Sequence, residues 1–279
     1  MIYLSPSKIN LHLGVTGRLP NGYHTIETLF MEIPWYDEID IEVCSKGPIK
    51  VTTSIDLCKM EENLCYKAAK LLKENSNLDC GCSIHLNKNI PTGAGLGGGS
   101  ANCAVVLKAL NSLWKLNYSE EELENLGVKL GADVPFFIKG GTSVARGVGD
   151  KLTTVKNNLS DIYILIIYKN IHVSTSWAYK NLNISLTEEK KSSIFDTVAL
   201  RGLDMADLGS FGNDFEKVVF QKHRELKEII ELLDSEGSIF SRMSGSGSSI
   251  FGFFKDENKV FSLEERFRGE GCLTKVVKF

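Results

Sequence analysis

The chain has 279 residues, of which 43% are hydrophobic and 24% are charged. These values are close to those of ordinary globular proteins and exclude a disordered or a fibrous protein. The formal net charge of −3 gives no overall attraction for nucleic acid or an anionic membrane, so we expect a partner of neither kind. The length exceeds the size at which a single hydrophobic core usually stops growing, which favours two domains.

The sequence predicts neither membrane insertion nor export. The longest strongly apolar run, residues 162–168, is too short to span a bilayer and predicts a buried strand. The first residues lack a basic region followed by an apolar block, so we expect a cytoplasmic protein. The seven cysteines are an odd number and include no CxxC pair, which predicts reduced thiols. A metal or redox role for Cys80 and Cys82 is the alternative, but no second pair accompanies them.

The first part of the chain predicts mainly strands. Apolar and polar residues alternate in part from Tyr3 to Val15, which indicates a half-buried strand, and Asn21-Gly22 then predicts a turn. Similar patterns predict strands at residues 26–33, 37–44, 49–53 and 83–90. Between them, Asn63 is a predicted cap for a helix. The apolar stripe of that helix repeats at helical spacing and consists of Leu64, Ala68, Leu71 and Leu72.

A glycine-rich run joins the strand at 83–90 to a predicted helix. The run reads PTGAGLGGGSANCA at residues 91–104, and apolar residues recur at helical spacing from Val106 onward. Ser119 and Glu122 form a predicted capping box for a second helix, through Leu130. The segment GADVPFF follows at residues 131–137, and its Pro135 indicates that a helix ends nearby.

The rest of the chain predicts the order βαββαβ after a glycine-rich turn at residues 146–149. The predicted strands are 162–168, 238–243, 248–254 and 272–279, with a helix at 257–268 before the last strand. This order fits a split-βαβ, ferredoxin-like module, so we predict an α+β protein with domains at 1–156 and 157–279. The pattern from residue 181 to residue 212 is mixed, and we assign no helices there.

The glycine run predicts an anion-binding site. A backbone without Cβ atoms can wrap closely around a ligand, and the first turn of the following helix presents unpaired N–H groups. Gly93, Gly95 and Gly98 also satisfy the GxGxxG pattern of dinucleotide-binding folds, but no second strand with an acidic end follows. The lysine of a P-loop and the motifs of protein kinases are absent as well. A tight turn without a ligand remains the alternative.

Phosphoryl transfer requires charge neutralisation and a carboxylate near the attacking hydroxyl. Asp133 is the candidate carboxylate, because it lies among small and apolar residues where an unpaired buried charge would be costly. The alternative is an ordinary aspartate at a turn or helix end. Lys8, on a largely apolar predicted strand, is its candidate partner, and an exposed strand lysine is the alternative. Asn10 lies two residues from Lys8 and therefore points to the same face of the strand.

Taken together, these motifs resemble the GHMP kinase superfamily, which includes galactokinase, homoserine kinase and mevalonate kinase. The glycine run matches the second motif of the superfamily, and MSGSG at residues 243–247 matches its third. Further blocks resemble the branch that acts on a cytidine-diphosphate-linked methylerythritol. They are SKINLHL (7–13), NGYHTIETLF (21–30), GADVPFF (131–137), GVGD (147–150), VSTSWAY (173–179) and NDFE (213–216).

The resemblance implies a two-domain GHMP kinase fold, with an N-terminal ribosomal-protein-S5-domain-2-like ATP-binding domain and a C-terminal ferredoxin-like domain. It implies transfer of the γ-phosphate of ATP to the 2-hydroxyl of the methylerythritol, in the non-mevalonate route to isoprenoids. Asp133 would be the general base and Lys8 would orient it. ATP would bind at Pro91, Gly93, Ala94, Gly95, Leu96, Gly97, Gly98, Gly99 and Ser100, with Ser100 also near Mg²⁺.

The resemblance also assigns the acceptor site. The ring of Tyr23 would stack on the cytosine and His24 would hydrogen-bond its edge, while an ordinary turn histidine is the alternative for His24. Val148 would add backbone contacts, Tyr179 would be the second stacking ring, and Asn10 would help to hold the substrate. The expected phosphate acceptor is therefore a small molecule and not a macromolecule.

The chain departs from the superfamily pattern in three places, one of which is Cys103 in place of the usual alanine. Many relatives have two serines where this chain has Ser100-Ala101, and the usual His-Pro-Gly is replaced by residues 168–172, YKNIH. Two other functions remain open: a superfamily kinase for mevalonate or homoserine, and a non-catalytic nucleotide-binding or RNA-binding module. Against the second, residues 238–254 lack a basic, aromatic-rich strand signature.

Overall fold

The computed structural model describes residues 1–76, 79–182 and 193–279. The chain folds as two compact units, the first formed by residues 1–7, 34–92 and 97–140, and the second by residues 8–33, 93–96 and 141–279. Two long strands, β1 (Ile2–Arg18) and β2 (His24–Cys44), contribute residues to both units. The division at residue 156 stays a prediction. None of the described helices is long and apolar enough to span a membrane.

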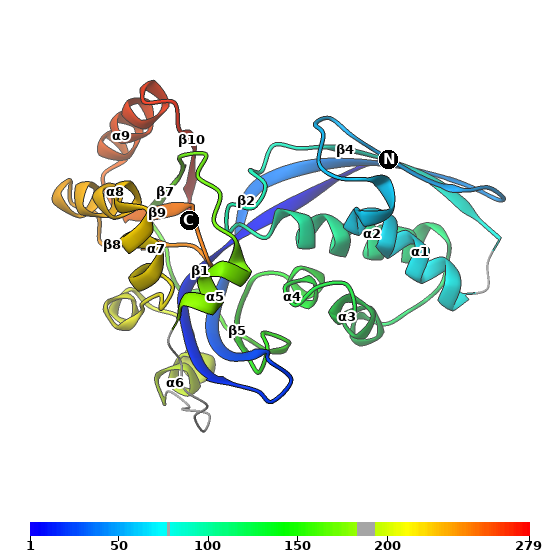
Figure 1. Ribbon diagram of the computed structural model, residues 1–279, viewed down its shortest axis with the longest axis horizontal. Helices are drawn as coiled ribbons and strands as arrows, with labels where there is room; N and C mark the ends of the chain where they lie inside the picture. The colour runs from blue at the N-terminus through cyan, green and yellow to red at the C-terminus, as the bar shows by residue number, and fades with distance from the viewer. Residues whose placement is uncertain (77–78, 183–192) are drawn as a thin grey trace. The chain divides into compact units, whose positions relative to one another are not determined.

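The first unit combines a small sheet with helices on one side of it (Figure 1). Strand β4 pairs in parallel with β3 and antiparallel with the last residues of β2. Cys82, Ile84 and Leu86 of β4 are buried, whereas the alternate side chains are exposed, which is the period of a half-buried strand. The elements are β3 (Ile49–Thr53), α1 (Leu64–Ser76), β4 (Gly81–Asn87), α2 (Gly98–Leu113), α3 (Glu120–Val128) and α4 (Val134–Lys139), with a short 3₁₀ helix at Met60–Glu62.

Local sequence signals account for the helices of this unit. The side chain of Asn63 accepts a hydrogen bond from the N–H of Cys65 at 2.9 Å at the start of α1, and Ser119 and Glu122 form the predicted capping box of α3. Pro135 lies in the first turn of α4, a helix that the sequence analysis did not predict. Proline is tolerated there because its missing N–H would have no partner within the helix.

The second unit contains an antiparallel sheet with the strand order β10-β7-β9-β8. Helices α8 and α9 pack on this sheet through apolar faces that include Leu226, Leu233, Val260 and Phe267 (Figure 1). With the chain order β7, β8, β9, β10, this arrangement is the predicted ferredoxin-like βαββαβ module. The α+β, two-domain fold expected from the sequence is therefore confirmed.

The elements of the second unit follow in chain order. They are β5 (Thr142–Arg146), β6 (Lys151–Thr154), β7 (Tyr163–Tyr168), α5 (Thr175–Asn181), α6 (Ser193–Arg201), a 3₁₀ helix (Met205–Ser210), α7 (Glu216–Lys222), α8 (Arg224–Ser235), β8 (Phe240–Met243), β9 (Ile250–Phe254), α9 (Glu257–Gly269) and β10 (Leu273–Lys278). The hairpin of β5 and β6 was not predicted. Part of the segment left unassigned by the sequence, residues 183–192, lies outside the described residues.

The sequence analysis was wrong to divide β2 into two strands. It predicted separate strands at 26–33 and 37–44, but β2 is continuous through Pro34. Residues 28–31 of β2 pair with β5 and residues 38–44 pair with β4. Because Pro34 lies between these paired stretches, its missing N–H removes a hydrogen bond from neither ladder.

Candidate active site

The first part of the glycine run, residues 93–96, is held by backbone hydrogen bonds inside the second unit. The N–H of Lys8 donates to the carbonyl oxygen of Leu96 at 2.9 Å, and the N–H of Ser249 donates to that of Ala94 at 3.1 Å. Gly95 has a φ of +79°, and a Cβ at this position would lie 2.1 Å from the carbonyl oxygen of Ser244. A side chain at residue 95 is therefore excluded by both conformation and space.

The Gly-Ser-Gly segment after β8 is fixed by the segment NDFE. The side-chain amide of Asn213 donates to the carbonyl oxygens of Met243 at 2.7 Å and Gly245 at 2.8 Å. The carboxylate of Glu216 accepts from the N–H of Met243 at 2.9 Å, and burial raises the pKa of Glu216. The sequence identified NDFE only by resemblance, whereas the structure shows that it positions the segment that contacts Gly95.

Lys8 and Asn10 lie on the same face of β1, as their spacing predicts. Lys8 is only 4% exposed, and its Nζ donates to Oδ1 of Asn10 at 2.5 Å. The Nζ of Lys8 also lies 4.9 Å from the ring centroid of Phe30. Asn10 donates from Nδ2 to Thr28 at 2.8 Å, and its backbone N–H donates to Oγ of Ser244 at 3.2 Å. The exposed-lysine alternative for Lys8 is therefore wrong.

The second part of the glycine run begins α2 in the first unit. Gly98 is the first residue of α2, and Ser100 lies in its first turn, where N–H groups have no partner within the helix. A Cβ on Gly131 would lie 3.7 Å from Oγ of Ser100, so the segment that carries Asp133 lies beside this turn. Asp133 lies in the turn at the N-cap of α4, as the turn or helix-end alternative expects, although its side chain makes no capping hydrogen bond there. Because Lys8 belongs to the other unit, its pairing with Asp133 stays a prediction.

A buried polar cluster of Asp37, Lys88 and Asn102 anchors the same turn, and the sequence analysis missed it. Oδ1 of Asp37 accepts from the N–H groups of Asn89 at 2.7 Å and Ile90 at 2.8 Å. Its Oδ2 accepts from Nζ of Lys88 and, at 2.9 Å, from Nδ2 of Asn102 in α2. The Asp37 and Lys88 side chains are 0% and 3% exposed. All lone pairs of the carboxylate are thus used, as a buried charge requires.

One feature of the sequence indicates this cluster. From Met31 to Ile41, strand β2 buries alternate residues, and Asp37 falls in phase with the buried Trp35 and Ile39. A charged residue in the apolar phase of a strand predicts a buried partner. That partner, Lys88, comes 51 residues later in the chain, so sequence spacing could not identify it.

The residues expected to bind cytosine all belong to the second unit. The ring of His24 stacks on that of Tyr179 with centroids 4.7 Å apart, and Tyr179 meets Phe215 edge-on at 4.8 Å. Tyr23 is 66% exposed. Burial, together with the charge of Arg18, lowers the pKa of His24, which favours a neutral imidazole able to donate and to accept a hydrogen bond.

The turn that carries Val148 is hydrogen-bonded to β2, the strand that begins at His24. The N–H of Ile26 donates to the carbonyl oxygen of Gly147 at 2.8 Å. Arg146, just before this turn, is paired with Glu27 at 2.8 Å and with Asp196 at 2.6 Å. The structure therefore brings Val148 near the start of β2, although 124 residues separate Val148 from His24 in the sequence.

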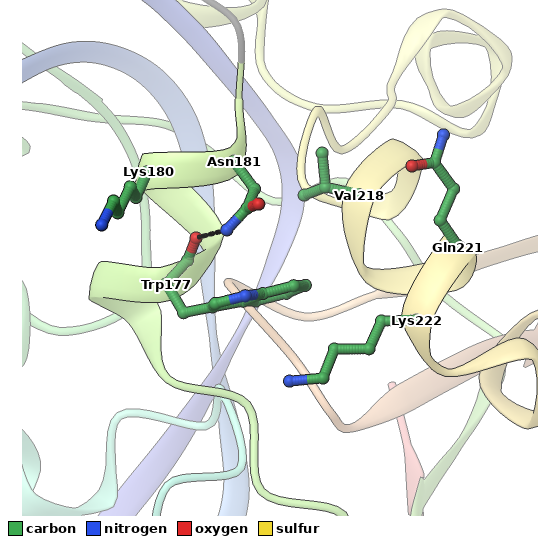
Figure 2. Close-up of a pocket in the computed structure, with 6 residues that line it drawn as sticks. All are labelled: Trp177, Lys180, Asn181, Val218, Gln221 and Lys222. Atoms are coloured by element: carbon green, nitrogen blue, oxygen red, sulfur yellow. Dashed lines mark hydrogen bonds between the residues drawn. The ribbon is translucent and has the colours of Figure 1, made fainter.

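An open pocket of about 440 Å³ lies between α5 and α7 in the second unit (Figure 2). It is lined by Trp177, Lys180, Asn181, Val218, Gln221 and Lys222. The Nζ of Lys222 lies 4.4 Å from the ring centroid of Trp177, so this lysine is already engaged by the indole. None of the residues predicted from the sequence to bind ATP or the acceptor lines this pocket.

Comparison with known proteins identifies the family. Residues 63–141 match the family described as GHMP kinases N terminal domain, and residues 198–271 match GHMP kinases C terminal. A curated 4-diphosphocytidyl-2-C-methyl-D-erythritol kinase from Chlorobium chlorochromatii (strain CaD3) is 40% identical over 262 residues, covering 93% of this chain and 90% of the relative. One of the same name from Clostridioides difficile (strain 630) is 39% identical, covering 91% and 86%.

Solved structures agree with these relatives. A crystal structure of 4-(cytidine 5'-diphospho)-2C-methyl-D-erythritol kinase superposes with a TM-score of 0.82 at 31% identity and covers 100% of both chains. The mevalonate kinase of Methanococcus jannaschii superposes with a TM-score of 0.71 at 18% identity, covering 99% of this chain and 97% of the other. The second likeness shows the shared fold alone.

Proposed function

Because the chain belongs to the GHMP kinase family, we propose that it transfers the γ-phosphate of ATP to the 2-hydroxyl of 4-diphosphocytidyl-2-C-methyl-D-erythritol. This reaction would place the enzyme in the non-mevalonate route to isoprenoid precursors. The observation that carries the proposal is the identity of about 40% with curated kinases of that name over more than nine tenths of this chain. Homoserine and mevalonate kinases share the fold at much lower identity.

The glycine run is the proposed ATP site, formed by Pro91, Gly93, Ala94, Gly95, Leu96, Gly97, Gly98, Gly99 and Ser100. Its support is a backbone that excludes a side chain at residue 95 and a helix start with N–H groups available for phosphate oxygens. The positive end of the 16-residue helix α2 adds to the attraction for a triphosphate. Lys88, whose Nζ would lie 3.2 Å from a Cβ on Gly98, also lies close to this turn, but its charge is neutralised by the buried carboxylate of Asp37.

Mg²⁺ is the proposed companion of ATP, and Ser100 is its proposed protein ligand. Among the described residues, no three His, Cys, Asp or Glu side chains gather so that they could hold a metal ion. This fits Mg²⁺ bound to a nucleotide, because such ions take most of their ligands from phosphates and water. When bound, the ion would neutralise the charge of the β- and γ-phosphates.

Asp133 and Lys8 are the proposed catalytic residues. The carboxylate of Asp133 would accept the proton of the acceptor hydroxyl as its oxygen bonds to the γ-phosphorus, and ADP would leave. The ammonium of Lys8 would orient Asp133 and stabilise the transferred charge. Its hydrogen bond to Asn10 supports this role, because the bond holds a nearly buried ammonium in one position.

The cytidine part of the acceptor is proposed to bind at Tyr23, His24, Val148 and Tyr179, with Asn10 nearer the polyol. The exposed ring of Tyr23 is available for stacking, and the neutral imidazole of His24 suits the cytosine edge, which has both donors and acceptors. Tyr179 stacks directly on His24, so a base would not stack between these two rings.

The domain division at residue 156 and a cytoplasmic location are part of the same proposal. The two family matches end before and begin after residue 156, which supports the division. ATP and a soluble, charged acceptor are both cytoplasmic metabolites, which supports the location.

The test is a coupled assay of ADP formation with three acceptors. We expect the purified chain to release ADP with the cytidine-diphosphate methylerythritol and not with mevalonate or homoserine, and mass spectrometry should show one added phosphate on the acceptor. Turnover with mevalonate or homoserine instead would reject the acceptor. Tight RNA binding at physiological salt without ATP turnover would reject the kinase.

A further inference from the structure

A histidine lies directly against the glycine run at a place where this chain departs from the GHMP pattern. A Cβ on Gly93 would lie 3.1 Å from Nδ1 and 3.3 Å from Cε1 of His172. Gly93 has a φ of +64° and carries no side chain, so the imidazole lies against bare backbone. Both residues belong to the second unit.

The position of His172 is fixed by bonds on either side of it. The carbonyl oxygen of the preceding Ile171 accepts a hydrogen bond from Oγ of Ser248, which is fully buried. Three residues after His172, Oγ1 of Thr175 is hydrogen-bonded to Oγ of Ser246 at 2.8 Å. These bonds tie the segment to the same Gly-Ser-Gly region that contacts Gly95. These hydrogen bonds therefore hold the segment that carries the imidazole in place beside the glycine run.

The ring of His172 is available to a ligand. The residue is exposed, and within the described part of the chain neither ring nitrogen has a hydrogen-bond partner. An imidazole N–H is a good donor to a phosphate oxygen, and the bond is strengthened by the negative charge of the acceptor. Gly93 is exposed as well, so a phosphate lying over this end of the run would lie within reach of the ring.

We propose that His172 is a further nucleotide-binding residue, which donates a hydrogen bond to a phosphate oxygen of the ATP held over Gly93. The proposal rests on the proposed role of the glycine run as the ATP site. It assigns to this chain a side-chain phosphate contact in the segment where the family's usual His-Pro-Gly is missing. A histidine that merely packs on Gly93, or that contacts the diphosphate of the acceptor, would give different results in the experiment below.

The experiment measures nucleotide affinity directly and then steady-state kinetics. Isothermal titration calorimetry with a non-hydrolysable ATP analogue and Mg²⁺, without acceptor, compares the wild type with His172→Ala and His172→Gln. His85→Ala is the matched control, because His85 is also exposed but lies on the outer face of β4 in the other unit. Thermal denaturation of each variant checks that it is folded.

We expect His172→Ala to weaken analogue binding about tenfold, the usual effect of losing one hydrogen bond to a charged group. His172→Gln, which keeps an N–H donor, should recover part of this loss, and His85→Ala should bind as the wild type does. In kinetics, the KM for ATP should rise with little change in the KM for the acceptor. Unchanged analogue affinity in folded His172→Ala, or a rise confined to the acceptor KM, would overturn the proposal.

Because the titration contains no acceptor, its result is independent of which alcohol the enzyme phosphorylates. If His172→Ala binds the ATP analogue more weakly and the wild type does not phosphorylate the cytidine-diphosphate methylerythritol, the proposed acceptor is rejected. The proposed nucleotide contact of His172 is then still supported. If the wild type phosphorylates that acceptor and His172→Ala binds the nucleotide as tightly as the wild type, the proposed acceptor is supported and the proposed role of His172 is rejected.

Discussion

The hydroxyl of Ser244 donates a hydrogen bond to the carbonyl oxygen of Gly95 at 2.8 Å, and its own carbonyl oxygen occupies the space that a Cβ on Gly95 would need. Two motifs that lie 149 residues apart in the sequence are thus in direct contact within the second unit. We infer that the third motif stabilises the conformation of the first part of the glycine run.

Gly95→Ala tests this contact. An alanine at a φ of +79° is strained by about 1–3 kcal/mol, and the clash with Ser244 adds to the strain. We expect a lower free energy of unfolding in urea and weaker binding of an ATP analogue. Gly209→Ala is the control, because nothing lies within 4 Å of a Cβ there. Equal stability of the two variants would contradict the described packing.

Asp133→Asn tests the proposed general base. Because an amide cannot accept the proton of the acceptor hydroxyl, we expect kcat to fall by about 10²-fold or more. The dissociation constants for ATP and acceptor, measured by calorimetry, should stay within a few-fold of the wild-type values. The exposed Asp56→Asn serves as the control. Near wild-type turnover in Asp133→Asn would remove this residue from the mechanism.

Asp37→Ala tests the buried cluster. The substitution leaves the ammonium of Lys88 buried without its carboxylate, so we expect a loss of about 3–5 kcal/mol in the free energy of unfolding. Glu74→Ala removes the exposed partner of Lys70 and should cost less than about 1 kcal/mol. The double variant Asp37→Asn/Lys88→Met should be more stable than Asp37→Ala. If the two single variants lost the same stability, the cluster would have no special role.

His12 predicts a pH-dependent loss of stability. Burial lowers the pKa of His12 from 6.5 to about 4, and its Nδ1 accepts a hydrogen bond from the N–H of Gly212 at 3.1 Å. Below pH 6.5 the unfolded chain binds a proton that the folded chain refuses, so stability falls as the pH falls. The fall should end near pH 4 and amount to at most about 3 kcal/mol.

Chemical denaturation at pH values from 7.5 to 4 measures this loss. His12→Asn keeps an acceptor for Gly212 but does not titrate, so its stability should change less between pH 6.5 and pH 4 than that of the wild type. His85→Gln, at an exposed position, should retain the wild-type pH dependence. Identical pH profiles for the wild type and His12→Asn would show that His12 is not the group responsible.

The cysteines should differ widely in reactivity. Burial raises the pKa of both Cys65 and Cys82 to about 12 and raises that of Cys103 as well, so few thiolates form near neutral pH. Cys44 and Cys58 are exposed. We expect a thiol-reactive probe at pH 8 to label these two within minutes, and to label Cys65, Cys82 and Cys103 only on unfolding. Mass spectrometry of the digested protein identifies the labelled positions.

The sequence by itself determined the local elements and the set of motifs. Alternation predicted the strands, the caps at Asn63 and Ser119 predicted two helices, and the strand order of the second half predicted the ferredoxin-like module. Each of these signals comes from residues close together in the chain, where backbone geometry and solvent exposure act directly. The motifs also indicated the family, since their order along the chain needs no structure to be recognised.

Only the tertiary structure decided which of these residues meet. It alone showed the contact of Gly95 with Ser244, the stacking of His24 on Tyr179, and the partner of Asp37. A hydrogen bond or a ring contact between distant residues depends on how strands pair and helices pack. The identities of the side chains alone do not determine the distances between such residues. The continuity of β2 through Pro34 also depends on tertiary structure. The pairing of the neighbouring strands decides whether the missing N–H of proline costs a hydrogen bond.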